Sequence, residues 1–577
     1  MAQRIRLREI CHARSGNKGN GVNVGIATYD PAHYAWVGEQ VTEQTVAEYV
    51  KPVTSDPISR YELPKLGAFN FVIPGVLEGS HSGTQILDTL GKCYSSILLD
   101  MEIDAPPDWT PGGAGRANAA SDVGVTPPAA NGNGAVRLGC GSAHGWDNIE
   151  AGVELAESGA VDYLVFDNMS EGIGSFKREQ ATGGRAYYQL NELRMPKVIA
   201  ACAETHTKII TNMGIVDPYG IAQWTKQLCR DLGLPHLRVM AVLGDDVLDL
   251  ARARDLRVAE SGQPVSAFGD RLLSANAYIS AMPIVEALQR GADIVVSGRA
   301  GDATQYLAPL IHEFGWSCDD WERKGKGLGI GHLMECGAQI TGGYFPDPPY
   351  KDAPDLGRVG FPIALVDDSG DAVITKLPGT GGVVNRMTCL EQLLYEIGDP
   401  ANYKHTDAVV DFSSTEITDI GPDQVRISGI KGHERPPTSL VVMNVHDGYF
   451  GVGEISYGGG GACARAELAA EIVTERLKVM GIDTSRLRFD YEGINSIFPW
   501  QGQSGPPAEI RLRAMGIFPQ LSDAEMLRTL VHELSCNGPS GGGGLALFIG
   551  NGGMGERISL YTSVLPQEDL RYQIVEV

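Results

Sequence analysis

Short, uninterrupted apolar runs alternate with stretches of helical periodicity between residues 136 and 302. Each run is rich in β-branched residues and stops at glycine, asparagine or carboxylate residues. Continuous apolar runs are typical of strands buried in a parallel sheet, and their alternation with helices indicates right-handed βαβ units. We therefore predict an α/β fold with a parallel core sheet. Its five strands are expected to end at 139–142, 167–168, 212–214, 244–246 and 297–299.

The pattern changes on either side of this region. From about residue 363 it becomes mixed α+β, with strands expected at 372–376, 424–428, 440–445, 486–490 and 509–515 and helices at 463–478 and 522–534. Before residue 105, strands are expected at 21–28, 69–73 and 95–103, with helices around 42–50 and 84–90. Pro, Gly, Ala, Asn and Ser dominate the stretch between. We predict a small α+β domain (1–104), a flexible linker (105–134), an α/β core with a ligand rim (135–362) and a mixed α+β region (363–577).

The composition places the chain among globular proteins. Its 577 residues exceed one ordinary core, and 43% of them are hydrophobic, so two or three domains are expected. The net charge of -24 opposes binding to nucleic acid or an anionic membrane, since both need a positive footprint. The cysteines form no CxxC pair, the N-terminus lacks a signal-peptide pattern, and no run approaches the ~20 apolar residues that span a bilayer. These features predict a cytoplasmic protein with reduced thiols.

Carboxylates gather where the predicted core strands end. In such a sheet these ends share one rim, where ligands bind. Neighbouring carboxylates push their pKa values apart and permit general acid or base chemistry, although each one alone also suits a helix cap. We predict catalytic roles for Asp167, Glu171, Asp302 and Arg299, and substrate binding by Asn212 and Asp246.

A glycine-rich segment follows the first predicted core strand. Gly139, Cys140, Gly141 and Ser142 suit a strand-to-helix turn whose amides receive a phosphate or carboxylate, or a purely structural turn. We predict substrate binding at these four residues. The segment lacks the third glycine of GxGxxG, which argues against a dinucleotide site. Cys140 is either a nucleophile near a helix N-terminus, with His144 close in sequence, or a buried structural thiol.

Residues 13–20 combine two cations with two glycines just before a predicted strand. We predict a loop whose amides form an anion nest, with Arg14 and Lys18 adding charge for substrate binding. A tight turn with solvated charges is the alternative. The spacing differs from a P-loop, so nucleotide hydrolysis is not indicated.

Two further features have a functional and a structural interpretation. His332 and Glu335 are three residues apart, which puts both on one helix face and is a spacing found in metal sites. No third ligand is evident, so we assign no metal. The glycine runs after Tyr457 and Ser540 offer backbone donors for a developing oxyanion, or let strands cross closely.

Several long motifs occur together after residue 330. They are GHLMECGAQ at 331–339, TGGYF at 341–345, TKLPGTGG at 375–382, GEISY at 453–457 and NGP at 537–539. Together they resemble the core of the acyclic terpene utilization (AtuA) family over about residues 135–577. ARSG at 13–16, KG at 18–19 and YELP at 61–64 are similar to the small AtuA-associated ferredoxin-like domain. In fused family members that domain follows the core, whereas here it precedes it.

The resemblance implies a role in degrading branched acids as CoA thioesters. We predict a lyase or hydratase that acts on a small branched carboxylate or acyl-CoA, with CoA as part of the substrate and no separate cofactor assigned. In this hypothesis Asp167 or Glu171 moves the proton, Arg299 and residues 139–142 hold the anion, and a glycine-run amide stabilises an enolate-like oxyanion.

Two alternatives belong to other classes. One is a non-catalytic acyl-CoA-binding or scaffold subunit that partners a pathway enzyme such as a biotin-dependent carboxylase. The other is acyl or CoA transfer through a covalent intermediate on Cys140 or Glu335. For a large enzyme of this kind, a symmetric homo-oligomer is expected.

Overall fold

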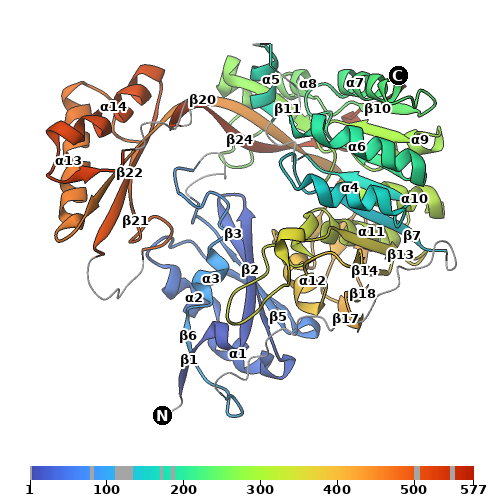
Figure 1. Cartoon of the computed structure of the whole chain (residues 1–577), viewed down its shortest axis with the longest axis horizontal. Coiled ribbons are helices and arrows are strands. Elements are labelled where there is room, and N and C mark those ends of the chain that lie inside the picture. Colours follow the sequence, from blue (N-terminus) through green and yellow to red (C-terminus); the bar gives the residue numbers. More distant parts are fainter. Residues whose placement is uncertain are drawn as a thin grey trace.

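The computed structural model describes residues 3–77, 84–110, 134–168, 173–181, 183–184, 189–499, 507–545 and 553–577. Figure 1 shows a small N-terminal domain in blue, a core that contains the large sheet, and a C-terminal lobe in orange and red. Long strands join the lobe to the core. Most of the predicted linker lies outside the described residues.

Five parallel strands form the centre of a ten-stranded sheet, in the order β7-β8-β9-β12-β10. All five end at the positions expected from the apolar runs. The prediction of an α/β fold with a parallel core sheet is therefore confirmed. The strands are β7 (Val136–Ser142), β8 (Tyr163–Phe166), β9 (Lys208–Thr211), β10 (Val239–Leu243) and β12 (Ile294–Ser297).

Helices pack on both faces of this sheet, because successive strand residues point to opposite sides. In β8, for example, Val165 belongs to one buried cluster and Leu164 to the other. The first cluster includes residues of α9 (Met282–Gln289), α10 (Thr304–Phe314) and α11 (Trp321–Met334). The second includes residues of α4 (Ile149–Ser158), α5 (Ile173–Ala181), α6 (Leu190–Thr205) and α7 (Pro218–Asp231).

Antiparallel strands extend the sheet at both edges. β13 pairs with β7, and β25 pairs with β10. The division expected after residue 362 falls at the start of β13, so strands on either side of that position share one sheet. The added strands are β13 (Pro362–Val366), β14 (Ala372–Lys376), β17 (Glu416–Gly421), β18 (Gln424–Ser428) and β25 (Gln573–Glu576).

A second sheet connects the core to the C-terminal lobe. Its longest strand, β20 (Thr438–Gly458), pairs with β11 near its start and with β22 near its end. At about 3.3 Å per residue the strand covers roughly 60–70 Å. The other elements are β11 (Leu272–Ala277), β21 (Leu487–Glu492), β22 (Glu509–Phe518), β23 (Gly542–Gly543), β24 (Met554–Pro566), α8 (Leu248–Ala253), α13 (Ala462–Val479) and α14 (Leu521–Asn537).

The small domain is built on an antiparallel sheet in the order β2-β3-β5-β4. Two predictions for this domain are wrong. Residues 94–98 are helical, with the buried side chains of Tyr94, Ile97 and Leu98 at helical spacing, and the described residues 84–90 form no helix. The elements are β1 (Arg4–Arg6), β2 (Cys11–Lys18), β3 (Gly21–Thr28), β4 (Ser59–Leu63), β5 (Ala68–Ile73), β6 (Glu102–Asp104), α1 (Tyr34–Gln40), α2 (Glu43–Val50) and α3 (Tyr94–Leu98).

The small domain packs against the part of the core that follows β14. Strands β2 and β3 contact α12 (Arg386–Leu393). After α12 the chain forms a three-stranded sheet of β15 (Tyr403–Lys404), β16 (Val409–Asp411) and β19 (Lys431–His433). Within the described ranges, no helix has the length and apolar character needed to cross a bilayer.

Candidate functional site

The carboxyl ends of the parallel strands form a buried polar network. The side-chain amide of Asn212 donates to Asp167 Oδ1 (3.1 Å), and its oxygen accepts from the Asn168 backbone (2.8 Å). Ser142 Oγ donates to the Asp167 carbonyl (2.8 Å). The structure thus brings together Ser142, Asp167 and Asn212 from three neighbouring strands. Glu171, the other proposed proton-transfer residue of this region, lies outside the described residues.

Of the two aspartates after β10, the buried one faces the rim. Asp245 Oδ2 accepts from the Arg299 backbone (2.8 Å) and from the Asn276 side chain (2.9 Å), and burial raises the pKa of Asp245. Asp246 instead pairs with Lys177 at 2.7 Å, and half of its side chain is exposed. Asp246 therefore points away from the buried network, because neighbouring residues of an extended chain point to opposite sides.

Arg299 is fully buried at this rim. Its guanidinium lies 4.0 Å from the centroid of the Tyr278 ring and forms a 3.0 Å ion pair with Asp302. One third of the Asp302 side chain is exposed. Two of the predicted catalytic residues therefore form one charged pair at the edge of the solvent.

The glycine-rich segment is not the turn that the sequence suggested. Gly139, Cys140, Gly141 and Ser142 belong to β7, and α4 begins only at Ile149 after an Asn148 cap. A Cβ on Gly141 would lie 2.4 Å from the Phe166 ring, so close packing accounts for this glycine. Asn148 Oδ1 accepts from the first helical amides, which leaves fewer donors for an anion.

Cys140 is unsuited to nucleophilic attack at neutral pH. Its side chain is fully buried in β7. Burial raises the pKa of the Cys140 thiol to about 12. Since the thiolate is the nucleophile, the covalent alternative loses its cysteine candidate.

Arg14 and Lys18 lie in a strand rather than in a loop. The residues of β2 pair with those of β3 along its whole length, so its amides do not form the predicted anion nest. Alternate residues of β2 point toward the large core: His12, Arg14, Gly16 and Lys18 all contact residues between 339 and 398. Because alternate residues of a strand point to the same side, Arg14 and Lys18 both point toward the core.

A buried triad of polar residues links the two parts. His12 Nδ1 lies 2.8 Å from Glu391 Oε1, which also accepts from Lys351 Nζ. His12 is fully buried, and 4% of each of the other two side chains is exposed. Burial raises the pKa of Glu391, but Lys351 and His12 outweigh this effect and lower it. We call His12, Lys351 and Glu391 the docking triad.

The end of α11 carries the HxxE pair that the sequence singled out. A Cβ on Gly331 would lie 2.5 Å from the Ala303 carbonyl, so this glycine lets α11 approach the turn after β12. His332 Nε2 lies 3.2 Å from the Leu393 carbonyl, and His332 Nδ1 lies 3.2 Å from Glu335 Oε1. A carbonyl can only accept a hydrogen bond, so His332 Nε2 carries a proton. A second proton is shared between His332 Nδ1 and Glu335 Oε1.

Glu335 is the carboxylate whose pKa falls near neutrality. Burial, opposed by His332 and aided by the charges of Asp302 and Glu396, raises the pKa of Glu335 to about 7. Its side chain is 15% exposed. The close approach of Gly331 to Ala303 places the α11 end beside the turn that carries Arg299 and Asp302.

Lys18 extends from the small domain toward the His332–Glu335 pair, with Tyr403 between them. Its Nζ donates to the Glu396 carbonyl (3.2 Å) and lies 5.4 Å from the centroid of the Tyr403 ring. The Tyr403 ring meets His332 edge-on, with centroids 5.2 Å apart. Lys18 is accessible to solvent, yet surrounding protein lowers the pKa of its amine against the opposing effect of Glu396 and Glu335. We call Lys18, His332, Glu335, Glu396 and Tyr403 the interdomain cluster.

The glycine runs lie elsewhere. The run that begins at Gly458 ends β20 in the C-terminal lobe, and Gly542 in β23 pairs with Tyr457. The start of β20 is near the rim, since the Leu440 carbonyl accepts from the Tyr278 amide. Most of the length of β20 therefore separates the glycine runs from Arg299. The oxyanion role predicted for the amides of these runs does not fit this geometry.

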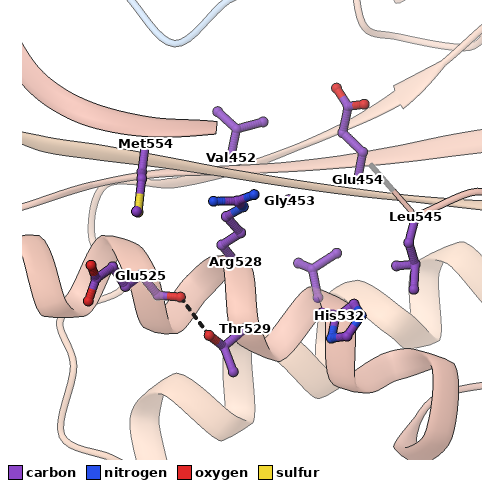
Figure 2. A pocket seen from close by; sticks show the side chains of 10 residues that line it. Val452, Gly453, Glu454, Glu525, Arg528, Thr529, His532, Leu545 and Met554 are labelled. Carbon is purple, nitrogen blue, oxygen red and sulfur yellow. Dashed lines mark hydrogen bonds between the residues drawn. The ribbon is translucent and has the colours of Figure 1, made fainter. Parts of the chain in front are cut away.

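Figure 2 shows a pocket of about 410 Å³ between β20 and α14 in that lobe. Arg528 rises from α14 toward the strand, and His532 lies one turn further along. The Glu454 carboxylate is already held by Arg511, with Nε 2.9 Å from Oε2. The pocket contains none of the predicted site residues and no hydrogen-bonded acid–base pair among its described lining residues. We therefore take the interdomain cluster, with the adjacent rim, as the candidate functional site.

Sequence reasoning missed some of these residues. Asp245 lies at a predicted strand end, but the sequence favoured its neighbour Asp246. Glu396 and Tyr403 join the site through contacts that no local pattern reveals. Only the HxxE spacing marked His332 and Glu335. No group of three potential metal ligands occurs within the described residues.

Comparison with known families agrees with this arrangement of domains. Residues 136–575 match the model of the acyclic terpene utilisation family protein AtuA, and residues 5–104 match the AtuA ferredoxin-like domain. The chain belongs to the AtuA family, with its ferredoxin-like domain before the core. No curated protein and no solved structure matches the chain.

Proposed function

We propose that this AtuA-family protein is a lyase- or hydratase-type enzyme acting on a small branched carboxylate or acyl-CoA. Membership of the family places the chain in acyclic terpene utilisation. The observation that carries the proposal is the hydrogen-bonded His332–Glu335 pair, partly exposed beside the Arg299–Asp302 ion pair. A carboxylic acid with a pKa near neutrality is suited to both accepting and returning a proton.

The pair forms one proton-transfer unit. The Leu393 carbonyl fixes the orientation of the imidazole and occupies Nε2. With His332 neutral, its lone pair at Nδ1 accepts from protonated Glu335; with His332 charged, Nδ1 donates to the carboxylate. One proton can therefore pass between His332 Nδ1 and Glu335 Oε1, and Glu335 can exchange it with a ligand.

The proposed reaction interconverts a β-hydroxyacyl compound and its α,β-unsaturated product. Glu335 takes the proton from the α-carbon, the C–H bond electrons form the double bond, and the β-hydroxyl leaves. The same proton returns to that hydroxyl, so water is released and no other reactant is needed. Arg299 and Lys18 are the cations that would stabilise negative charge on the carbonyl oxygen.

Proton exchange with solvent tests the proposal without a known substrate. The purified protein is incubated in D₂O with short branched acyl-CoAs, unsaturated acyl-CoAs and the free acids, and loss of the α-proton signal is followed by NMR. Glu335→Gln should abolish exchange. Glu286→Gln, an exposed residue of α9 paired with Arg290, is the matched control and should retain it.

A thermal-shift measurement on the same compounds separates the alternatives. A ligand at about 100 times its Kd should stabilise the protein by ~2.7 kcal/mol. Binding of an acyl-CoA without exchange or turnover would favour the scaffold subunit instead. Loss of exchange in Glu335→Gln with retained binding supports the enzyme.

A further inference from the structure

Three cations of the small domain converge on one short segment of the core. The Arg14 guanidinium carbon lies 4.4 Å from the centroid of the Tyr344 ring and 4.5 Å from that of Tyr395. Lys92 Nζ is 4.1 Å from the Tyr395 ring and pairs with the Glu396 carboxylate at 3.2 Å. Lys18 bonds to the carbonyl of the same glutamate. In a chain with a net charge of -24, three cations thus gather around Tyr395 and Glu396.

Arg14 has unused hydrogen-bonding capacity. The residue is 2% exposed, and its Nη2 donates to the side chain of Gln339. Its Nε is buried and has no hydrogen-bond partner among the described residues. Buried polar groups are normally satisfied, so an orphaned donor on a charged group calls for an explanation. One wall of the aromatic sandwich opens outward, because Tyr344 is 56% exposed.

The backbone around Arg14 is strained on both sides. Tyr344 has φ = 62° and Glu396 has φ = 56°, which is the left-handed region that non-glycine residues rarely adopt. Gly16 makes the close approach possible, since a Cβ there would lie 2.5 Å from Glu396 Cγ. Such conformations persist where the surroundings enforce them, and they concentrate at ligand sites.

We infer that Arg14, with Lys18 and Lys92 beside it, binds the free carboxylate of an organic-acid substrate. The flat, sandwiched guanidinium matches the planar geometry of a carboxylate. A phosphate dianion suits the site less well, because it concentrates two negative charges on one group near the Glu335 and Glu396 carboxylates, whereas each carboxylate of an organic acid carries one. The placement of the substrate's reacting carbon near Glu335 rests on the proposed function; the anion site itself does not.

Calorimetric titration with glutarate tests the inference, with glutaramide as the uncharged probe and inorganic phosphate as the competing anion. Glutarate should bind and glutaramide should not. Arg14→Gln should weaken glutarate binding about 10- to 100-fold, as expected for loss of a charged hydrogen bond. Arg14→Lys, which keeps the charge but loses the fork, should recover only part of the affinity.

Arg8→Gln is the matched control. Arg8 also belongs to the small domain and contacts the core, pairing with Asp347 at 3.2 Å and lying over the Tyr350 ring. This variant should bind glutarate with the wild-type Kd. Wild-type affinity in a folded Arg14→Gln protein, or tighter binding of phosphate than of glutarate, would overturn the inference.

The two proposals fail separately. Glu335→Gln should bind glutarate at least as tightly as the wild type, because a competing carboxylate is removed, while losing proton exchange. If that variant keeps exchange but Arg14→Gln loses glutarate, the enzyme mechanism fails and the carboxylate site stands. If both variants bind normally, the carboxylate site fails whatever the activity.

Discussion

Glu335 Oε1 lies 3.2 Å from His332 Nδ1, while the other imidazole nitrogen is committed to the Leu393 carbonyl. The contact holds one proton between two groups and leaves part of the carboxylate exposed. Burial is the main cause that raises the pKa of Glu335 to about 7. The protonation of this carboxylate should therefore change near neutral pH.

If Glu335 is the base of the free enzyme, kcat/KM should increase with pH and level off above about pH 7. The carboxylate form accepts the proton, and it predominates only above its pKa. Glu335→Gln should lower kcat/KM by about 10²–10⁴ and remove this pH dependence. A profile that keeps its inflection in the variant would assign it to another group.

The same carboxylate should make the protein less stable as pH rises. Its folded pKa of about 7 exceeds the ordinary value of 4.5, so between these values the unfolded chain binds fewer protons and the free energy of unfolding falls with pH. Glu335→Gln removes this penalty and should stabilise the protein at pH 8 by at most about 3 kcal/mol. Urea titrations at pH 5 and pH 8 measure the difference, and parallel changes in both proteins would contradict it.

Gly331 sets the position of the HxxE pair. In Gly331→Ala the new Cβ would lie 2.5 Å from the Ala303 carbonyl, so α11 must shift away from the Arg299–Asp302 turn. We expect a loss of about 1–3 kcal/mol of stability together with reduced activity. Gly458→Ala is the control, because nothing lies within 4 Å of its added Cβ. Equal activity in the two variants would show that the pair tolerates displacement.

The sequence predicts the core strands well because each is a continuous apolar run with a polar end. It fails for β2, where Arg14, Asn17 and Lys18 suggest a loop. The strand has a polar face because that face meets α12 and the residues after it, more than 300 positions away. The side toward which Asp245 or Asp246 points was equally hidden, since it depends on the register of one strand end.

The docking triad should stabilise the domain interface. Lys351→Met leaves Glu391 buried without its cation and should cost about 3–5 kcal/mol in urea denaturation. Lys65→Met removes an exposed interdomain ion pair with Glu416 and should cost less than about 1 kcal/mol. Similar losses in both variants would mean that burial adds nothing to the triad.

Acid should weaken the same interface. Burial lowers the pKa of His12 below its ordinary 6.5, against the opposing effect of Glu391. The unfolded chain therefore binds this proton more readily, and the stability contributed by neutral His12 is present above pH 6.5 and is lost as pH falls. Protection factors of the β2 amides, which correct for the intrinsic slowing of exchange in acid, should fall between pH 7 and pH 5, and His12→Gln should flatten this dependence.

Cysteine labelling distinguishes acid–base chemistry from covalent catalysis. At pH 8, iodoacetamide should modify the exposed Cys318 and Cys536 but not Cys140, because burial both excludes the reagent and raises the pKa of the Cys140 thiol to about 12. Cys140→Ala should retain proton exchange, with a modest loss of stability from the vacated space in β7. Rapid native-state labelling of Cys140, or complete loss of exchange in a folded Cys140→Ala protein, would restore the thiol as a reacting group and displace Glu335 from the centre of the mechanism.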